Sequence, residues 1–169
     1  MFAPTKVSSR SPSPDAVSID VQYACEGPDM PRTDALSAWA AAALGREQEG
    51  VELTVRVVDE AEAARLNETY RHRAGPTNVL SFPFEPPADI PCPLLGDVVV
   101  CAPVVAREAV QQGVDPRAHW AHVVVHGVLH LLGYDHEREE EARIMESLEV
   151  AILARLGFPD PYNQPSVQT

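Results

Sequence analysis

The chain has 169 residues and a formal net charge of −12, which argues against binding a nucleic acid by general attraction over the whole surface. Its three cysteines are odd in number and form no C-x-x-C pair, so neither a disulfide framework nor a cysteine metal site is indicated. Because no apolar stretch is long enough to cross a bilayer and no signal peptide is evident, we expect a cytoplasmic protein with no membrane partner.

The length suits one domain, which we assign to residues 16–158. Residues 1–15 are rich in serine and proline and are predicted to be a disordered extension. Residues 159–169 are predicted to be a tail.

Apolar and polar residues alternate over residues 17–23 and again over 51–58, which predicts two strands with one buried face each. Between them we expect a helix that is capped by Thr33 or Asp34 and ends at Gly45.

A second helix, capped by Asp59, is expected over residues 60–70. It leads into a basic loop at 71–76, whose Gly-Pro sequence ends the helical pattern. A short third strand is predicted at 78–82, and the strongly apolar run at 96–101 is typical of a central strand covered on both faces.

Between the third and fourth strands, five prolines in residues 83–93 predict an irregular surface loop. A βαβ unit over residues 51–82 would make part of the sheet parallel. The order of elements predicts an α+β fold: a small mixed, mostly parallel sheet of about four strands covered by helices, with a long central helix carrying the metal site described below.

Three helices are predicted after the fourth strand, at 103–112, 115–132 and 137–156. Asp115 suits the N-cap of the second of these helices. The last one is amphipathic, and its acidic residues are expected to form a solvated face: Glu137, Glu139, Glu140, Glu141, Glu146 and Glu149.

A candidate metal site lies at the end of the helix at 115–132. His126 and His130 are four residues apart, so they point the same way and can hold one ion between them. Gly133 can adopt a positive φ and end the helix, after which the chain turns back to present His136. Three imidazoles leave a tetrahedral ion one open position, as in catalytic zinc sites.

Two more histidines, His119 and His122, fall in the same stripe of this helix. His122 precedes His126 by four residues and could compete as a ligand. Only the pair of His126 with His130 uses the turn at Gly133, so we expect His119 and His122 in the core or at the rim of the site.

Four stretches together resemble the YbeY family of metal-dependent endoribonucleases, also described as rRNA maturation factors. Their order and spacing fit along about residues 17–157. These stretches are Leu66-Asn67 with Tyr70-Arg71, Pro76-Thr77-Asn78-Val79-Leu80-Ser81-Phe82-Pro83, Leu95-Gly96-Asp97-Val98, and His126-Gly127-x-Leu129-His130-Leu131-x-Gly133-Tyr134-Asp135-His136.

The resemblance implies one zinc ion (Zn²⁺) per chain, held by His126, His130 and His136, and a functional arginine at Arg71. It also implies a bacterial cytoplasmic hydrolase that cleaves single-stranded ribosomal RNA in rRNA maturation and ribosome quality control. The expected partners are then RNA and the ribosome or its proteins.

Hydrolysis of a phosphodiester requires a cation for the charge that builds on the phosphoryl group. Arg71 is the catalytic candidate because a guanidinium is a planar and permanently charged fork for phosphate oxygens. His72 and Arg73 are weaker candidates for contact with the RNA backbone. No residue can be nominated as the general base from the sequence.

Four other polar residues have less specific roles. Asp135 could orient an imidazole or cap the last helix. Thr77 and Ser81 are expected on the third strand, where they could line a groove, and Asp97 is expected to be a turn residue.

Two alternatives to the nuclease remain. The histidine spacing also resembles the metzincin proteases, in which a glutamate follows the first histidine and acts as the general base, whereas Gly127 stands here. The third interpretation is a non-catalytic ribosome assembly factor with a structural zinc.

Overall fold

The computed structural model describes residues 17–27, 29–45, 50–87 and 92–162. The predicted extension at 1–15 and residues 163–169 of the predicted tail lie outside these ranges. Four strands form one sheet in the order β1-β2-β4-β3. Their bounds are Ser18–Tyr23 (β1), Glu52–Val58 (β2), Val79–Pro83 (β3) and Leu94–Cys101 (β4).

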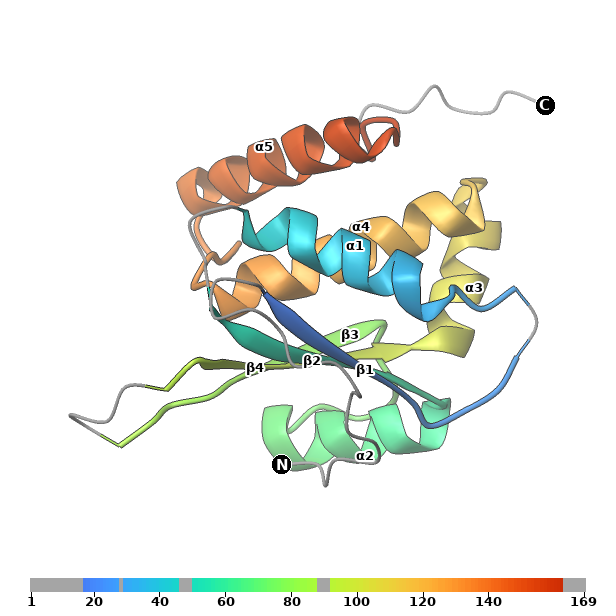
Figure 1. The fold of residues 1–169 in the computed structure, drawn as a ribbon. Helices are drawn as coiled ribbons and strands as arrows, with labels where there is room; N and C mark the ends of the chain where they lie inside the picture. Colours follow the sequence, from blue (N-terminus) through green and yellow to red (C-terminus); the bar gives the residue numbers. More distant parts are fainter. Residues whose placement is uncertain (1–16, 28, 46–49, 88–91, 163–169) are drawn as a thin grey trace.

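Five helices cover the two faces of this sheet (Figure 1). Helix α2 lies on one face, and α1 and α4 lie on the other, with α5 outermost against them. Helix α3 packs beside α4 and α2. The bounds are Thr33–Leu44 (α1), Glu60–Arg71 (α2), Ala102–Gln112 (α3), Pro116–Leu131 (α4) and Glu139–Leu156 (α5). In the part of the chain that the structure describes, no helix combines the length and apolarity needed to cross a membrane.

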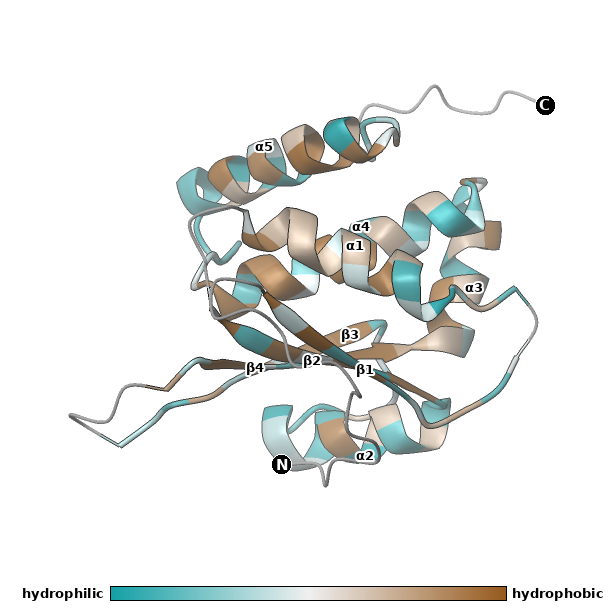
Figure 2. Cartoon of the chain, viewed as in Figure 1, coloured by the Kyte–Doolittle hydropathy of each residue, from teal (hydrophilic) through white to brown (hydrophobic). Residues whose placement is uncertain are grey.

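Strand β4 occupies the interior position predicted for it. It pairs in parallel with β2 and antiparallel with β3, while β1 pairs in parallel with β2. Val98 and Val100 belong to the core beneath α1 and α4, whereas Val99 and Cys101 belong to the core beneath α2. The hydrophobic strands between two helical layers are visible in Figure 2. The predicted α+β fold with a mixed, mostly parallel sheet is therefore confirmed.

The parallel part of the sheet differs from the prediction. A parallel βαβ unit over residues 51–82 is wrong, because β3 runs antiparallel to β4 and hence to β2. The very apolar β4 is inserted between these two strands, where both of its faces and both of its edges are covered. The parallel pairs are β1 with β2 and β2 with β4.

Several element ends also differ. Arg32 is the N-cap of α1, so the cap predicted at Thr33 or Asp34 is wrong. Helix α5 begins at Glu139, two residues later than predicted, with Arg138 as its N-cap. The caps predicted at Asp59 and Asp115 are confirmed, since the side chain of each accepts a hydrogen bond from a backbone N–H of the first helical turn.

Asp97 lies within β4 rather than in a turn, where it pairs with Phe82 and Thr54. Burial raises the pKa of its carboxyl group, while a hydrogen bond from Thr54 acts in the opposite direction.

Candidate metal centre

Helix α4 lies very close to the sheet at Gly127. A Cβ atom at this position would come within 2.6 Å of Val98 Cγ1 and 3.0 Å of Val79 Cγ2. The buried Ser81 hydroxyl donates a hydrogen bond of 2.7 Å to the Gly127 carbonyl, which fixes α4 to β3. The helix thus packs residue 127 directly against the sheet, next to strand residues that line the same hollow as His126 and His130.

The chain reverses direction at Gly133, as predicted. Gly133 has a φ of +102°, and its N–H donates to the His130 carbonyl, while Tyr134 N–H donates to the Leu129 carbonyl. Such a left-handed residue after the helix satisfies its last carbonyls and redirects the chain. His136 is thereby brought next to the histidines of α4, with ring centroids 5.5 Å from His126 and 5.1 Å from His130.

The three predicted ligands come together. One nitrogen from each of His126, His130 and His136 lies within 4.8 Å of the other two. The Nε2 atoms of His126 and His130 are 3.1 Å apart, close to the roughly 3.3 Å expected for two nitrogens bonded to one tetrahedral zinc ion. In donor type and spacing, the three histidines could hold a metal ion.

The protonation state of His130 suits a metal site. Burial, followed by the neighbouring charges of His126 and His136, lowers the pKa of His130 to about 4. The ring is therefore neutral at pH 7, which leaves a nitrogen lone pair for a ligand.

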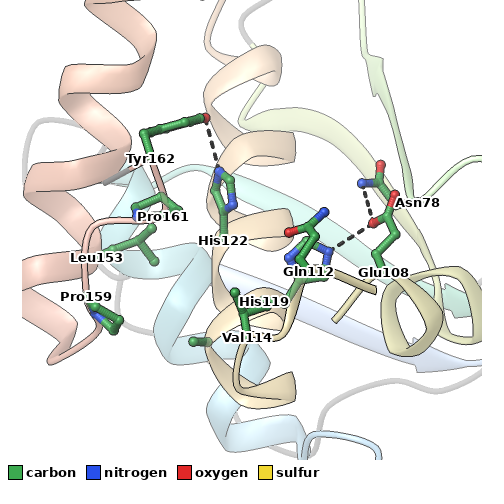
Figure 3. A pocket seen from close by; sticks show the side chains of 11 residues that line it. Asn78, Glu108, Gln112, Val114, His119, His122, Leu153, Pro159, Pro161 and Tyr162 are labelled. Atoms are coloured by element: carbon green, nitrogen blue, oxygen red, sulfur yellow. Dashed lines mark hydrogen bonds and ion pairs between the residues drawn. The ribbon is translucent and has the colours of Figure 1, made fainter. Parts of the chain in front are cut away.

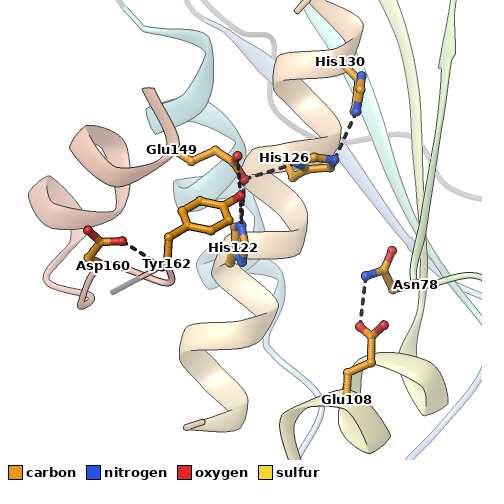
Figure 4. A network of polar contacts seen from close by, with 8 residues as sticks. All are labelled: Asn78, Glu108, His122, His126, His130, Glu149, Asp160 and Tyr162. Atoms are coloured by element: carbon orange, nitrogen blue, oxygen red, sulfur yellow. Dashed lines mark hydrogen bonds and ion pairs between the residues drawn. The ribbon is translucent and has the colours of Figure 1, made fainter. Parts of the chain in front are cut away.

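Glu149 is a component of the site that we did not predict. The acidic run of the last helix predicts a solvated face that includes Glu149, but its exposed fraction is 1% and it faces α4. Its Oε2 accepts hydrogen bonds from His122 Nε2 at 2.7 Å and His126 Nδ1 at 3.2 Å (Figure 4). Burial acts to raise the pKa of Glu149, but these hydrogen bonds outweigh it and lower the pKa to about 2. A signal did exist in the sequence, since Glu149 lies in the apolar stripe of α5 with Met145 and Ile152.

His119 and His122 are held by carboxylates instead. His119 is buried, with Nε2 2.9 Å from an oxygen of Glu108, which also accepts a hydrogen bond from Asn78. His122 is less deeply buried and faces Glu149. Both rings line a cavity of about 350 Å³ beside the C-terminal residues of the described chain (Figure 3). Neither belongs to the three-histidine cluster, in agreement with the expected core and rim positions.

The three histidines open into a hollow of about 640 Å³. Arg71 and Arg73 line the same hollow, as do Thr77 and Ser81. Thr77 precedes β3 rather than lying on it. The sequence-predicted arginine and the predicted ligands thus border one space, although they come from widely separated parts of the chain.

A hydrogen bond from α2 holds the loop that follows Arg71 and contains Arg73. Arg71 is the last residue of α2, and the exposed His72 caps the helix in the left-handed conformation, with a φ of +57°. The side chain of the buried Asn67 donates a hydrogen bond of 2.9 Å to the Gly75 carbonyl. This bond spans the loop and holds both ends of the arginine segment in place.

Asp135 and Glu137 add negative charge to the rim of the hollow. Asp135 Oδ1 accepts a hydrogen bond of 2.7 Å from His136 N–H and lies 4.0 Å from His136 Nδ1. It therefore restrains the backbone at His136. The alternative role as N-cap of α5 is wrong, since Arg138 occupies that position.

Position 127 also bears on the protease alternative. A glutamate in this place would have to start from a Cβ atom only 2.6 Å from a core valine. A side chain at this position would therefore require Val98 or α4 to shift, which the glycine avoids.

Comparisons with known proteins identify the family of the chain. The family model described as Endoribonuclease YbeY matches residues 29–157. An "Endoribonuclease YbeY" from Nitrosococcus oceani is 54% identical over 149 residues, which cover 87% of this chain and 97% of that protein. The solution structure of TM1509 from Thermotoga maritima superimposes with a TM-score of 0.54 at 25% identity, covering 88% of this chain and all of that one. The chain therefore belongs to the YbeY family of endoribonucleases and is a hydrolase of the nuclease class.

Proposed function

We propose that this protein is a zinc-dependent endoribonuclease that cleaves single-stranded ribosomal RNA in rRNA maturation and ribosome quality control. In this proposal it acts in the cytoplasm, on RNA presented by the ribosome or its proteins. The observation that carries the proposal is the hollow shared by a three-histidine cluster and two arginines.

His126, His130 and His136 would hold one zinc ion per chain. When bound, zinc makes water more acidic and acts as a Lewis acid toward a phosphoryl oxygen. The neutral state of His130 favours this use of the ring, and the open hollow gives a substrate access to the site.

Arg71 would bind the phosphate and stabilise the negative charge that builds on it during cleavage. Its guanidinium can donate two parallel hydrogen bonds to phosphate oxygens, which a lysine cannot do. Arg73 would contact an adjacent phosphate of the RNA backbone. The hydrogen bond from Asn67 to Gly75 supports this role because it holds the loop that follows Arg71 and contains Arg73.

The net charge of −12 makes general attraction to RNA weak. Two arginines in one hollow give a local binding site whose affinity should fall as salt is raised. Targeting to the ribosome would then depend on protein contacts or on the shape of the RNA.

Incubation of the zinc-loaded protein with a single-stranded rRNA fragment, a duplex of the same sequence and unfolded casein tests the substrate class. We expect cleavage of the single strand only, and loss of this activity in His126→Ala. Casein cleavage without RNA cleavage would support a protease. Cleavage of no substrate, with ribosome binding retained in His126→Ala, would support the assembly factor.

A further inference from the structure

Glu149 forms the centre of a buried polar network between α4, α5 and the segment after α5. Both of its carboxylate oxygens are used. Oε2 lies 2.7 Å from His122 Nε2 and 3.2 Å from His126 Nδ1, and Oε1 accepts a hydrogen bond of 2.8 Å from the Tyr162 hydroxyl (Figure 4). With an exposed fraction of 1%, this carboxylate has its partners within the protein.

The contact with Glu149 determines which nitrogen of His126 carries the hydrogen. An ionised carboxylate can only accept hydrogen bonds, so Nδ1 of His126 must be the donor. A neutral imidazole with its hydrogen on Nδ1 has its lone pair on Nε2. Nε2 is the atom that lies 3.1 Å from Nε2 of His130, on the side of the three-histidine cluster.

His122 makes this arrangement rigid. Its Nε2 donates to the same carboxylate oxygen as His126 Nδ1 does, so the carboxylate is held by two rings one helical turn apart. The contact also explains why His122 is not available as a ligand, although its spacing to His126 equals that of His126 to His130.

Tyr162 holds the second oxygen of the carboxylate. It follows α5 in a turn in which its N–H donates to Asp160 Oδ1 at 2.8 Å, and its hydroxyl lies 3.2 Å from His122 Nε2. Residue 162 lies beyond the segment matched by the family model, which ends at residue 157. The C-terminal segment of this chain therefore reaches a side chain that contacts one of the three histidines.

We propose that Glu149 and Tyr162 are positioning residues of the metal centre: Glu149 holds His126 in the tautomer that presents the Nε2 lone pair, and Tyr162 fixes the Glu149 carboxylate. This inference rests on the proposed metal site. Metal-binding histidines commonly donate their second N–H to a carboxylate, and loss of such a partner typically weakens metal binding about 10–100-fold.

Two measurements test the proposal: the ¹⁵N chemical shifts of the His126 ring in metal-free protein, and the zinc dissociation constant from competition with a chelator. In the wild type we expect hydrogen on Nδ1 and a lone pair on Nε2. Glu149→Met removes the acceptor at similar volume, so the hydrogen should move largely to Nε2 and zinc binding should weaken about 10–100-fold.

Three further variants separate positioning from simple packing. Glu149→Gln keeps an acceptor oxygen, so it should retain the wild-type tautomer and lose less than about tenfold in zinc affinity. Tyr162→Phe should cause a similarly small loss. Glu140→Met, on an exposed position of the same helix, is the matched control and should change neither quantity.

The proposal would be overturned if the wild type carried the hydrogen on Nε2 of His126. It would also be overturned if Glu149→Met kept the tautomer and the zinc affinity of the wild type. If Glu149→Met does not fold, the ring shifts of the wild type still decide the role of Glu149. Wild-type zinc affinity in Tyr162→Phe would overturn the role of Tyr162. A wild type with the expected tautomer but no zinc binding would refute the proposed metal function while supporting the assigned contact, so the two failures are distinguishable.

Discussion

The two halves of the histidine stripe on α4 differ in what lies opposite each ring. In the first half, His119 faces Glu108 and His122 faces Glu149. In the second half, His126 and His130 face each other and His136, with nitrogens close enough for one ion. The same spacing of four residues separates His122 from His126 and His126 from His130, so spacing alone does not select a metal ligand. In the proposed site, the groups on the facing elements distinguish the ligands from the other histidines.

His126 belongs to both halves, because Nδ1 contacts Glu149 and Nε2 faces the cluster. One nitrogen is held by a carboxylate while the other stays available. His126 therefore connects the buried network around Glu149 with the open hollow.

The largest expected effect comes from removing the His136 ring, compared with removing His122 from the first half of the stripe. His136→Ala should weaken zinc binding by more than about a hundredfold, since loss of a supporting residue alone costs about 10–100-fold. His122→Ala, the matched control, should weaken it less than about tenfold. Chelator competition measures both constants, and the opposite order would show that His122, not His136, is the ligand.

Arg71→Ala should reduce RNA cleavage about a hundredfold or more, because removing a group that stabilises developing negative charge typically costs 10²–10³ in rate. Zinc affinity and melting temperature should not change, since the residue is exposed at the end of α2. Arg65→Ala, an exposed arginine on the same helix, serves as the control. An unfolded Arg71→Ala protein, or one that cleaves normally, would contradict a catalytic role.

Gly127→Ala tests the close approach of α4 to the sheet at residue 127. Its Cβ would lie 2.6 Å from Val98 Cγ1, and such overpacking costs about 1–3 kcal/mol, offset by about 1 kcal/mol of helix propensity. We expect a net loss of up to about 2 kcal/mol in the free energy of unfolding, measured with urea. The loss should be smaller in a Val98→Ala background, and an equal loss there would argue against this contact as the cause.

The smallest expected effect is the pH dependence of the metal-free protein. The pKa of His130 is about 4 in the folded state and 6.5 as an unperturbed value, so the unfolded chain binds more protons between these limits. The free energy of unfolding should therefore fall on acidification from pH 6.5 to 4. After a discount for solvent screening, this contribution is on the order of 1 kcal/mol.

Glu149 acts in a lower pH range. Its depressed pKa of about 2 contributes stability that is lost only as the pH falls below the usual value of 4.5.

The contribution of His130 can be measured separately, above pH 4.5. Denaturant titrations at several pH values should show a weaker dependence of the free energy of unfolding on pH in His130→Gln than in the wild type. An unchanged slope in this variant would assign the dependence to another group.

The features that the sequence predicted are local ones. The apolar run of β4, the caps at Asp59 and Asp115, and the turn at Gly133 each depend on residues close together in the chain. The histidine cluster could be predicted for the same reason, since eleven consecutive residues, 126–136, contain all three rings and the turn between them.

The features that the sequence missed depend on distant partners. The direction of β3 is set by its pairing with β4, which places β4 between β3 and β2. The role of Glu149 depends on the helix that faces it, because the same carboxylate on a solvent-facing side of α5 would have no such partners. The contact of Tyr162 lies in a segment whose composition suggested only a tail.

The central claim is that the three histidines hold the metal on which RNA cleavage depends. Its most direct test is cleavage of one single-stranded rRNA fragment by the protein before chelation, after removal of the metal, and after addition of one equivalent of zinc. We predict full loss of cleavage on removal and recovery with zinc in the wild type, but no recovery in His136→Ala. Cleavage that persists in the metal-free protein would contradict the account.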